Sequence, residues 1–139
     1  MSTFLDQIRQ FAVKSNYQAK KAVEGIRVAV SESVINKTPL DTGFARGNWQ
    51  SNIGNPIKSE VTRFDREAGF APTGGDGIAV REAKEVASKD IDKDFYITNN
   101  AEYIMNLEFG GSDQAPNGMV RITVADFQNI VNDVVEKLK

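Results

Sequence analysis

The stretch Thr38-Pro-Leu-Asp-Thr-Gly-Phe-Ala-Arg-Gly-Asn-Trp49 predicts a corner between a long helix and the first strand of the chain. Pro39 ends the preceding helix, because its ring clashes with the turn before it. Asp41 and Thr42 carry short oxygen-bearing side chains that bond nearby backbone N–H groups. Gly43 supplies a backbone conformation that other residues resist. Taken alone, the stretch favours a structural corner over a binding site.

Two larger side chains follow this corner. Arg46 is placed to reach back to Asp41 or across to another carboxylate. Trp49 is the only tryptophan in the chain, and we expect it to anchor the core.

Composition limits the functions that the chain can have. Its 139 residues suit one domain, and 40% hydrophobic and 26% charged residues are typical of a globular protein. The net charge of −2 gives no overall basic field for nucleic acid. Without cysteine or histidine the chain has no disulfides, thiol chemistry or Ser-His-Asp site. We see no signal peptide and no membrane-spanning apolar run, so we expect no membrane partner.

A long helix is predicted over residues 3–36, before the corner. Apolar residues recur there at spacings of three and four, which marks one helical face. The helix would be roughly 50 Å long, more than a small core needs. Part of its apolar stripe is therefore expected to face a partner subunit, and the alternative is that the whole helix packs on its own sheet. Its polar face is basic and includes Lys14 and Lys21, which are candidates for contacts with DNA or a neighbour, although a solvated face is favoured.

The remaining elements follow in order after the corner. We expect the following: two short strands between 46 and 61 joined by the turn Gly54-Asn55-Pro56, a loop at 62–77, a helix at 78–88, a strand at 95–98, a short helix within 101–111 ended by Gly110, and a last helix capped by Asn117. One face of that last helix carries Val120, Val124, Phe127, Val131, Val134 and Leu138.

Two chemical motifs are incomplete in this sequence. The glycine-rich loop has the outer spacing of a phosphate loop but lacks its Lys and Ser/Thr, and its aromatic residues Phe64 and Phe70 are candidates for an interface. The segment Asp90-Ile-Asp-Lys-Asp94 opens like a calcium loop, yet Phe95 replaces the required Gly. A carboxylate metal enzyme is a weak alternative, with the acidic residues Asp65, Glu67, Asp90, Asp92 and Asp94 in turn-like segments. We therefore expect no enzyme activity, metal or cofactor.

Glu108 is the acidic residue most in need of a partner. It precedes the aromatic Phe109, so we expect it to be partly buried and paired with a cation. Arg46 within the same subunit is the first choice. The alternative is that Arg46 bonds only Asp41, and Glu108 faces a neighbouring subunit.

Three separated pieces together resemble the head–tail joining family of tailed bacteriophages, also described as neck or tail-completion proteins. The pieces are Thr38-Pro-Leu-Asp-Thr-Gly-Phe-Ala-Arg46 with Trp49, Ile97-Thr-Asn-Asn-Ala-Glu-Tyr-Ile-Met-Asn-Leu-Glu-Phe-Gly110, and Gln114-Ala-Pro-Asn-Gly-Met119 before a terminal helix. The structural motif of the resemblance consists of Pro39, Asp41, Thr42, Gly43, Arg46, Trp49, Tyr103, Glu108 and Gly110. Residues 63–90 match no motif of the family.

The resemblance implies an α+β fold with a small antiparallel sheet packed against a long N-terminal helix and a C-terminal helix. It implies a single domain over 1–139 with a loop-rich insertion at about 63–90. It also implies a structural virion protein, made in the host cytoplasm, that forms a homo-oligomeric ring of six copies in preference to twelve at the head–tail junction. Its partners would be other neck and tail proteins, and DNA would pass through the lumen without sequence-specific binding. The alternative function is a DNA-binding accessory protein that uses the basic face of the first helix.

Overall fold

A computed structural model describes residues 3–65 and 76–138 of the chain. Within them the elements are α1 (Phe4–Lys37), α2 (Phe44–Gly47), β1 (Trp49–Ile53), α3 (Ile78–Ala87), β2 (Phe95–Asn99), α4 (Ile104–Glu108), α5 (Val120–Ala125) and α6 (Phe127–Lys137). A two-stranded antiparallel sheet with helices around it confirms the α+β prediction. None of the described helices combines the length and apolar character needed to cross a membrane.

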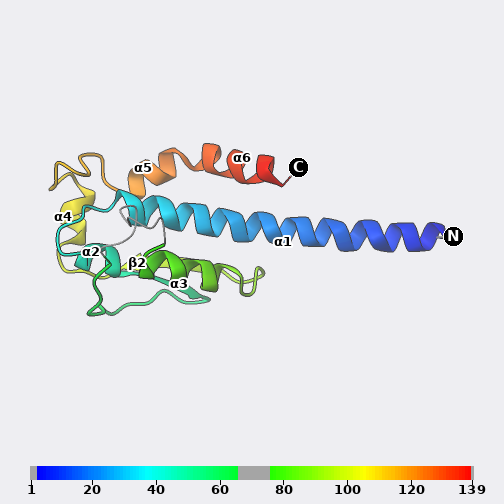
Figure 1. Cartoon of the computed structure of the whole chain (residues 1–139), viewed down its shortest axis with the longest axis horizontal. Coiled ribbons are helices and arrows are strands. Elements are labelled where there is room, and N and C mark those ends of the chain that lie inside the picture. The colour runs from blue at the N-terminus through cyan, green and yellow to red at the C-terminus, as the bar shows by residue number, and fades with distance from the viewer. Residues whose placement is uncertain (1–2, 66–75, 139) are drawn as a thin grey trace.

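Helix α1 is the longest element, with 34 residues. It starts with a capping box, in which Asp6 N donates to Thr3 Oγ1 at 3.1 Å and Thr3 N donates to Asp6 Oδ2 at 3.3 Å. It ends just before Thr38-Pro39, as the proline predicted. Its N-terminal half projects beyond every other element, as Figure 1 shows. The prediction of a helix longer than its own core requires is therefore confirmed.

The C-terminal half of α1 lies between two layers. Helices α5 and α6 run along one side, and α3 with the sheet lies on the other (Figure 1). A Cβ at Gly25 would lie 2.8 Å from Val134 Cγ1, so this glycine permits the close approach of α1 and α6. The main buried cluster consists of Val34, Ile35, Trp49, Ala79, Val80, Ala115 and Met119.

The sheet does not form as the local sequence predicted. β1 pairs with β2, so that Ser51 lies opposite Ile97, and residues 57–61 form no strand. The predicted hairpin is therefore wrong. The return segment is instead held by side chains of the corner and of β1: Gln50 Nε2 donates to the Ser59 carbonyl at 2.8 Å, and Asn48 Oδ1 accepts from Val61 N at 2.9 Å.

The last helix is also different from the prediction. It begins at Val120 rather than after Asn117, and it is divided at Asp126, whose N–H donates to the carbonyls of Ile122 and Thr123. Thr123 is buried and its hydroxyl lies 2.7 Å from that of Ser33 on α1. The apolar face that the sequence indicated for this helix is only partly covered, because Val120, Val124 and Phe127 are all exposed.

Candidate functional site

Arg46 is a buried side chain beneath the corner. It is 3% exposed, and the short helix α2 points it at the end of α1. Its Nε donates to the Thr38 carbonyl at 2.8 Å and its Nη2 donates to the Asn36 carbonyl at 3.3 Å. The last carbonyls of a helix lack partners in the helix and carry partial negative charge, so a cation stabilises them. Burial lowers the pKa of Arg46, and the nearby charge of Asp65 opposes that effect.

Trp49 joins the first strand to the same helix end. Its Nε1 donates to Thr38 Oγ1 at 2.7 Å, and the Thr38 hydroxyl donates to the Val34 carbonyl at 2.6 Å. Trp49 is 3% exposed, which confirms the prediction of a core anchor. Gly43 has a φ of 88°, and its carbonyl accepts from Gly47 N and Asp65 N. The corner is thus a rigid joint between α1, α2 and β1.

The first two polar residues of the motif lie at the rim of this joint. Thr42 Oγ1 accepts from Phe44 N at 3.3 Å, as its position predicted. Asp41 is exposed and makes no hydrogen bond or ion pair within residues 3–65 and 76–138, so the alternative clamp between Arg46 and Asp41 is wrong. The pKa of Tyr103 is raised by burial and then by the charges of Asp41 and Glu60.

Glu108 serves as the N-terminal cap of α5. Its carboxylate accepts from the backbone N–H groups of Met119 at 2.7 Å, Val120 at 3.0 Å and Arg121 at 2.8 Å. The Arg121 side chain lies 3.6 Å from the carboxylate and stacks over the Phe109 ring. The predicted pair between Arg46 and Glu108 is wrong, because the helix start satisfies this carboxylate. The alternative that Glu108 faces a neighbour is also wrong, because the side chain is buried within its own chain.

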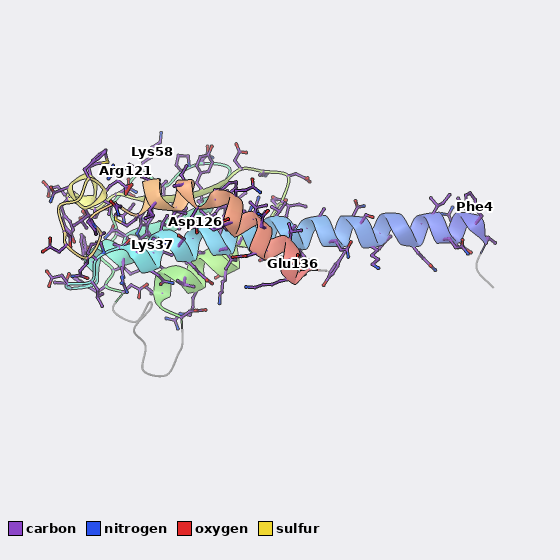
Figure 2. The ribbon with its side chains drawn as sticks, turned by 90° about the horizontal axis from the view of Figure 1, so that it is seen from above. Phe4, Lys37, Lys58, Arg121, Asp126 and Glu136 are labelled. Atoms are coloured by element: carbon purple, nitrogen blue, oxygen red, sulfur yellow. The ribbon has the colours of Figure 1, made fainter. Side chains whose placement is uncertain are left out.

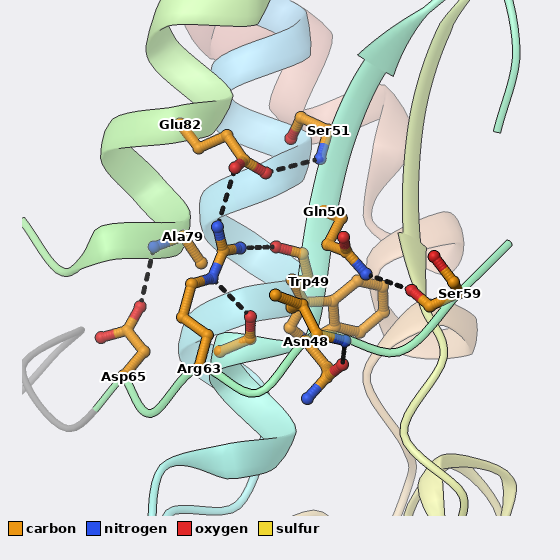
Figure 3. A network of polar contacts seen from close by, with 11 residues as sticks. Asn48, Trp49, Gln50, Ser51, Ser59, Arg63, Asp65, Ala79 and Glu82 are labelled. Carbon is orange, nitrogen blue, oxygen red and sulfur yellow. Dashed lines mark hydrogen bonds and ion pairs between the residues drawn. The ribbon is translucent and has the colours of Figure 1, made fainter. Parts of the chain in front are cut away.

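A further network that local spacing did not predict ties the start of the insertion to the corner (Figure 3). Arg63 donates through Nη1 to Glu82 Oε2 at 2.7 Å, through Nε to the Gly47 carbonyl at 2.7 Å and through Nη2 to the Trp49 carbonyl at 2.8 Å. Glu82 Oε1 accepts from Ser51 N at 3.0 Å. Side chains therefore occupy the outer edge of β1, where the predicted hairpin would have placed a strand.

Arg27 is the second arginine whose role the sequence did not indicate. It belongs to the basic face of α1 by sequence, but it is 8% exposed. Its guanidinium donates to the carbonyls of Ala87, Lys89, Asp90 and Lys93 at 2.7 to 3.2 Å and lies over the Phe95 ring. It closes the end of α3 and the turn into β2.

We expect Arg27→Ala to lower the free energy of unfolding by about 2–4 kcal/mol, because it leaves buried carbonyl groups without donors. Arg9→Ala is the matched control on the exposed part of the same helix and should change it by less than about 0.5 kcal/mol. Urea unfolding followed by circular dichroism measures both. Equal effects of the two substitutions would contradict this role of Arg27.

The residues predicted to form an interface lie in different places. Lys14 is exposed on the projecting part of α1, whereas Lys21 pairs with Glu24 at 3.9 Å and lies over the Tyr17 ring. Phe64 is half-exposed, and its ring packs against Phe44, which in turn contacts Tyr103. Phe70 lies outside the described residues.

The acidic residues of the metal-site alternative do not form a cluster where the structure describes them. Asp65 is buried and accepts from Ala79 N at 3.0 Å at the start of α3 (Figure 3). The three aspartates at 90, 92 and 94 lie in the exposed turn before β2, and Glu67 lies outside the described residues. No group of three or more side chains suited to a metal ion occurs in the described part of the chain.

Exposed apolar side chains gather on two helical surfaces of the described chain, and others lie near the corner and α4, among them Phe64, Tyr103, Met105 and Phe109. The first is the projecting arm, which we define as residues 4–20 of α1. Its exposed apolar side chains are Phe4, Leu5, Ile8, Val13 and Tyr17. The second is the α5–α6 face, which we define by Val120, Val124, Phe127 and Val135. Exposed apolar groups gathered in this way are typical of surfaces that bind other proteins.

No protein-family model, curated protein or solved structure matches this chain.

Proposed function

We propose that the chain is a structural protein of the head–tail junction of a tailed bacteriophage, where copies form a ring that joins the portal complex of the capsid to the tail. The observation that carries the proposal is the arm. Helix α1 continues beyond its own body and exposes apolar side chains that its own described residues leave uncovered (Figure 2). In proteins most of the stability of a helix comes from packing of its apolar face. A partner that covers the arm is therefore favoured.

The motif residues support this proposal in a second way. Arg46 and Glu108 bind backbone groups of their own chain, and Trp49 binds the Thr38 hydroxyl, so all three hold the body rigid. No substrate, metal or cofactor is needed to explain them. A rigid body with one projecting helix suits a subunit that acts by assembly, and we propose no enzyme activity for it.

We expect the protein to form a closed oligomer, with six copies favoured over twelve. Native mass spectrometry and sedimentation of the wild-type chain measure the copy number, and reconstruction of a virion locates it. A particle in which single copies are scattered over the surface contradicts the proposal. Binding to duplex DNA that weakens with salt, without any oligomer, would support the DNA-binding alternative instead.

A further inference from the structure

One side of the arm carries two exposed apolar side chains. Phe4 and Ile8 are 78% and 48% exposed and stand one turn apart, so they share a side of the helix. Ser15 and Ala19 continue that side by sequence, and their small side chains would let another helix approach closely. Val13 and Tyr17 are also exposed, but they lie about 140° and about 180° around the helix axis from Ile8.

The α5–α6 face is only partly covered by the rest of the chain. No residue of α6 is buried, although Ile130, Val131, Val134 and Leu138 turn toward α1. Four further apolar side chains on α5 and α6 are exposed beside them. A second helix packed along this face would bury the four exposed side chains and cover the half-buried ones beside them.

The two surfaces match in length and charge. The arm spans about 26 Å and the chain from Val120 to Lys137 about 27 Å, at the rise of an α-helix. The arm holds three basic residues against the single acidic Asp6, a net charge of +2. Residues 120–137 hold Asp126, Asp133 and Glu136 against Arg121 and Lys137, a net charge of −1. Asp126 and Asp133 are exposed on the body beside the α5–α6 face, and Figure 2 shows Asp126 there.

The arm cannot reach the α5–α6 face of its own chain. α1 is one continuous helix, α6 lies beside its C-terminal half, and the arm points away from that face (Figure 1). We infer that the arm of one copy packs along the α5–α6 face of a second copy. The contact joins two different surfaces, so it is head-to-tail and closes into a ring when the rotation fits. This inference rests on the proposed function and assigns its subunit interface.

Disulfide trapping tests the contact directly, because the natural chain has no cysteine. Tagged Ile8→Cys protein is mixed with untagged Val124→Cys protein and oxidised. We expect mixed disulfide dimers in excess over either homodimer, and at least about fivefold less trapping when Val13→Cys replaces Ile8→Cys, because that thiol faces away from the partner. Homodimers of Ile8→Cys as the main product would show arm-to-arm pairing and overturn the inference. Equal trapping by Val13→Cys would overturn it as well.

A charge placed on the arm gives the second test. We expect Ile8→Glu to weaken self-association by about tenfold or more, whereas Val13→Glu, which makes the same change of charge, has little effect. At concentrations where all three proteins are monomeric, both variants should have the circular dichroism and urea midpoint of the wild type, because the arm does not contact the body. If Ile8→Glu assembles like the wild type, the inferred contact between the arm and the α5–α6 face is wrong, but the ring proposal stands. If the wild type forms no oligomer and no thiol pair is trapped, both the inferred contact and the ring proposal are wrong.

Discussion

Glu108→Ala is expected to lower the free energy of unfolding by about 3–5 kcal/mol. The substitution removes the acceptor for three backbone N–H groups at the start of α5, and one of these bonds is fully buried. It also leaves Arg121 without its nearest carboxylate. Glu102→Ala is the matched control, because Glu102 is exposed in the same segment and should change stability by less than about 0.5 kcal/mol. Urea unfolding of the three proteins measures the difference, and equal midpoints would contradict the capping role.

The same carboxylate should make stability depend on acid pH. Burial alone raises the pKa of Glu108, but hydrogen bonds from Arg121, Met119 and Val120 and the charge of Arg121 together lower it below its ordinary value of 4.5. The contribution is therefore fully present above the unfolded-state pKa and is lost as the pH falls through the lower folded-state pKa. Glu108→Gln should flatten this acid-side decline. A variant that keeps the wild-type slope would show that other carboxylates produce it.

The long first helix and the corner could be predicted because their signals are local. The spacing of apolar residues predicted a helix over residues 3–36, and both ends lie within one residue of the observed α1, Phe4–Lys37. Pro39 marked the end of this helix. The corner glycine at 43 and the tryptophan at 49 were predicted in their observed roles. In each of these cases neighbouring residues alone determine the backbone conformation, so periodicity and turn chemistry are sufficient.

The prediction of a hairpin was wrong because strand pairing is not determined locally. The turn Gly54-Asn55-Pro56 predicted that the chain would return beside β1, but the side of β1 facing away from β2 is taken by the side chains of Arg63 and Glu82. The true partner, β2, follows more than forty residues later, beyond the insertion. Strand pairing depends on such distant competition, which spacing within the sequence does not reveal.

The partners of the buried charged residues could not be predicted from sequence patterns. Opposite charges were expected to pair, so Arg46 was matched with Glu108. Instead Arg46 and Arg27 donate to carbonyls at the ends of helices, and Glu108 accepts from N–H groups at the start of one. Helix ends carry unsatisfied backbone groups and partial charges, so they are as good a partner as a side chain. Which helix end meets which side chain is decided by tertiary packing.

Arg46→Ala is expected to be as destabilising as the loss of Glu108, at about 3–5 kcal/mol. It leaves the carbonyls of Thr38 and Asn36 without this donor and removes the positive charge near Asp65, which is 2% exposed. The exposed Arg81→Ala on α3 is the control and should change stability by less than about 0.5 kcal/mol.

Two double-mutant cycles then separate the partners of Arg46. Asp65→Asn keeps an oxygen for Ala79 N and removes the charge, so combining it with Arg46→Ala should lose less stability than the sum of the two changes, with a coupling of about 1–3 kcal/mol. The cycle of Arg46→Ala with Glu108→Ala should be additive within about 0.5 kcal/mol, because the two side chains share no partner. Coupling in the second cycle and additivity in the first would mean that Arg46 acts on the cap of α5 rather than on the corner.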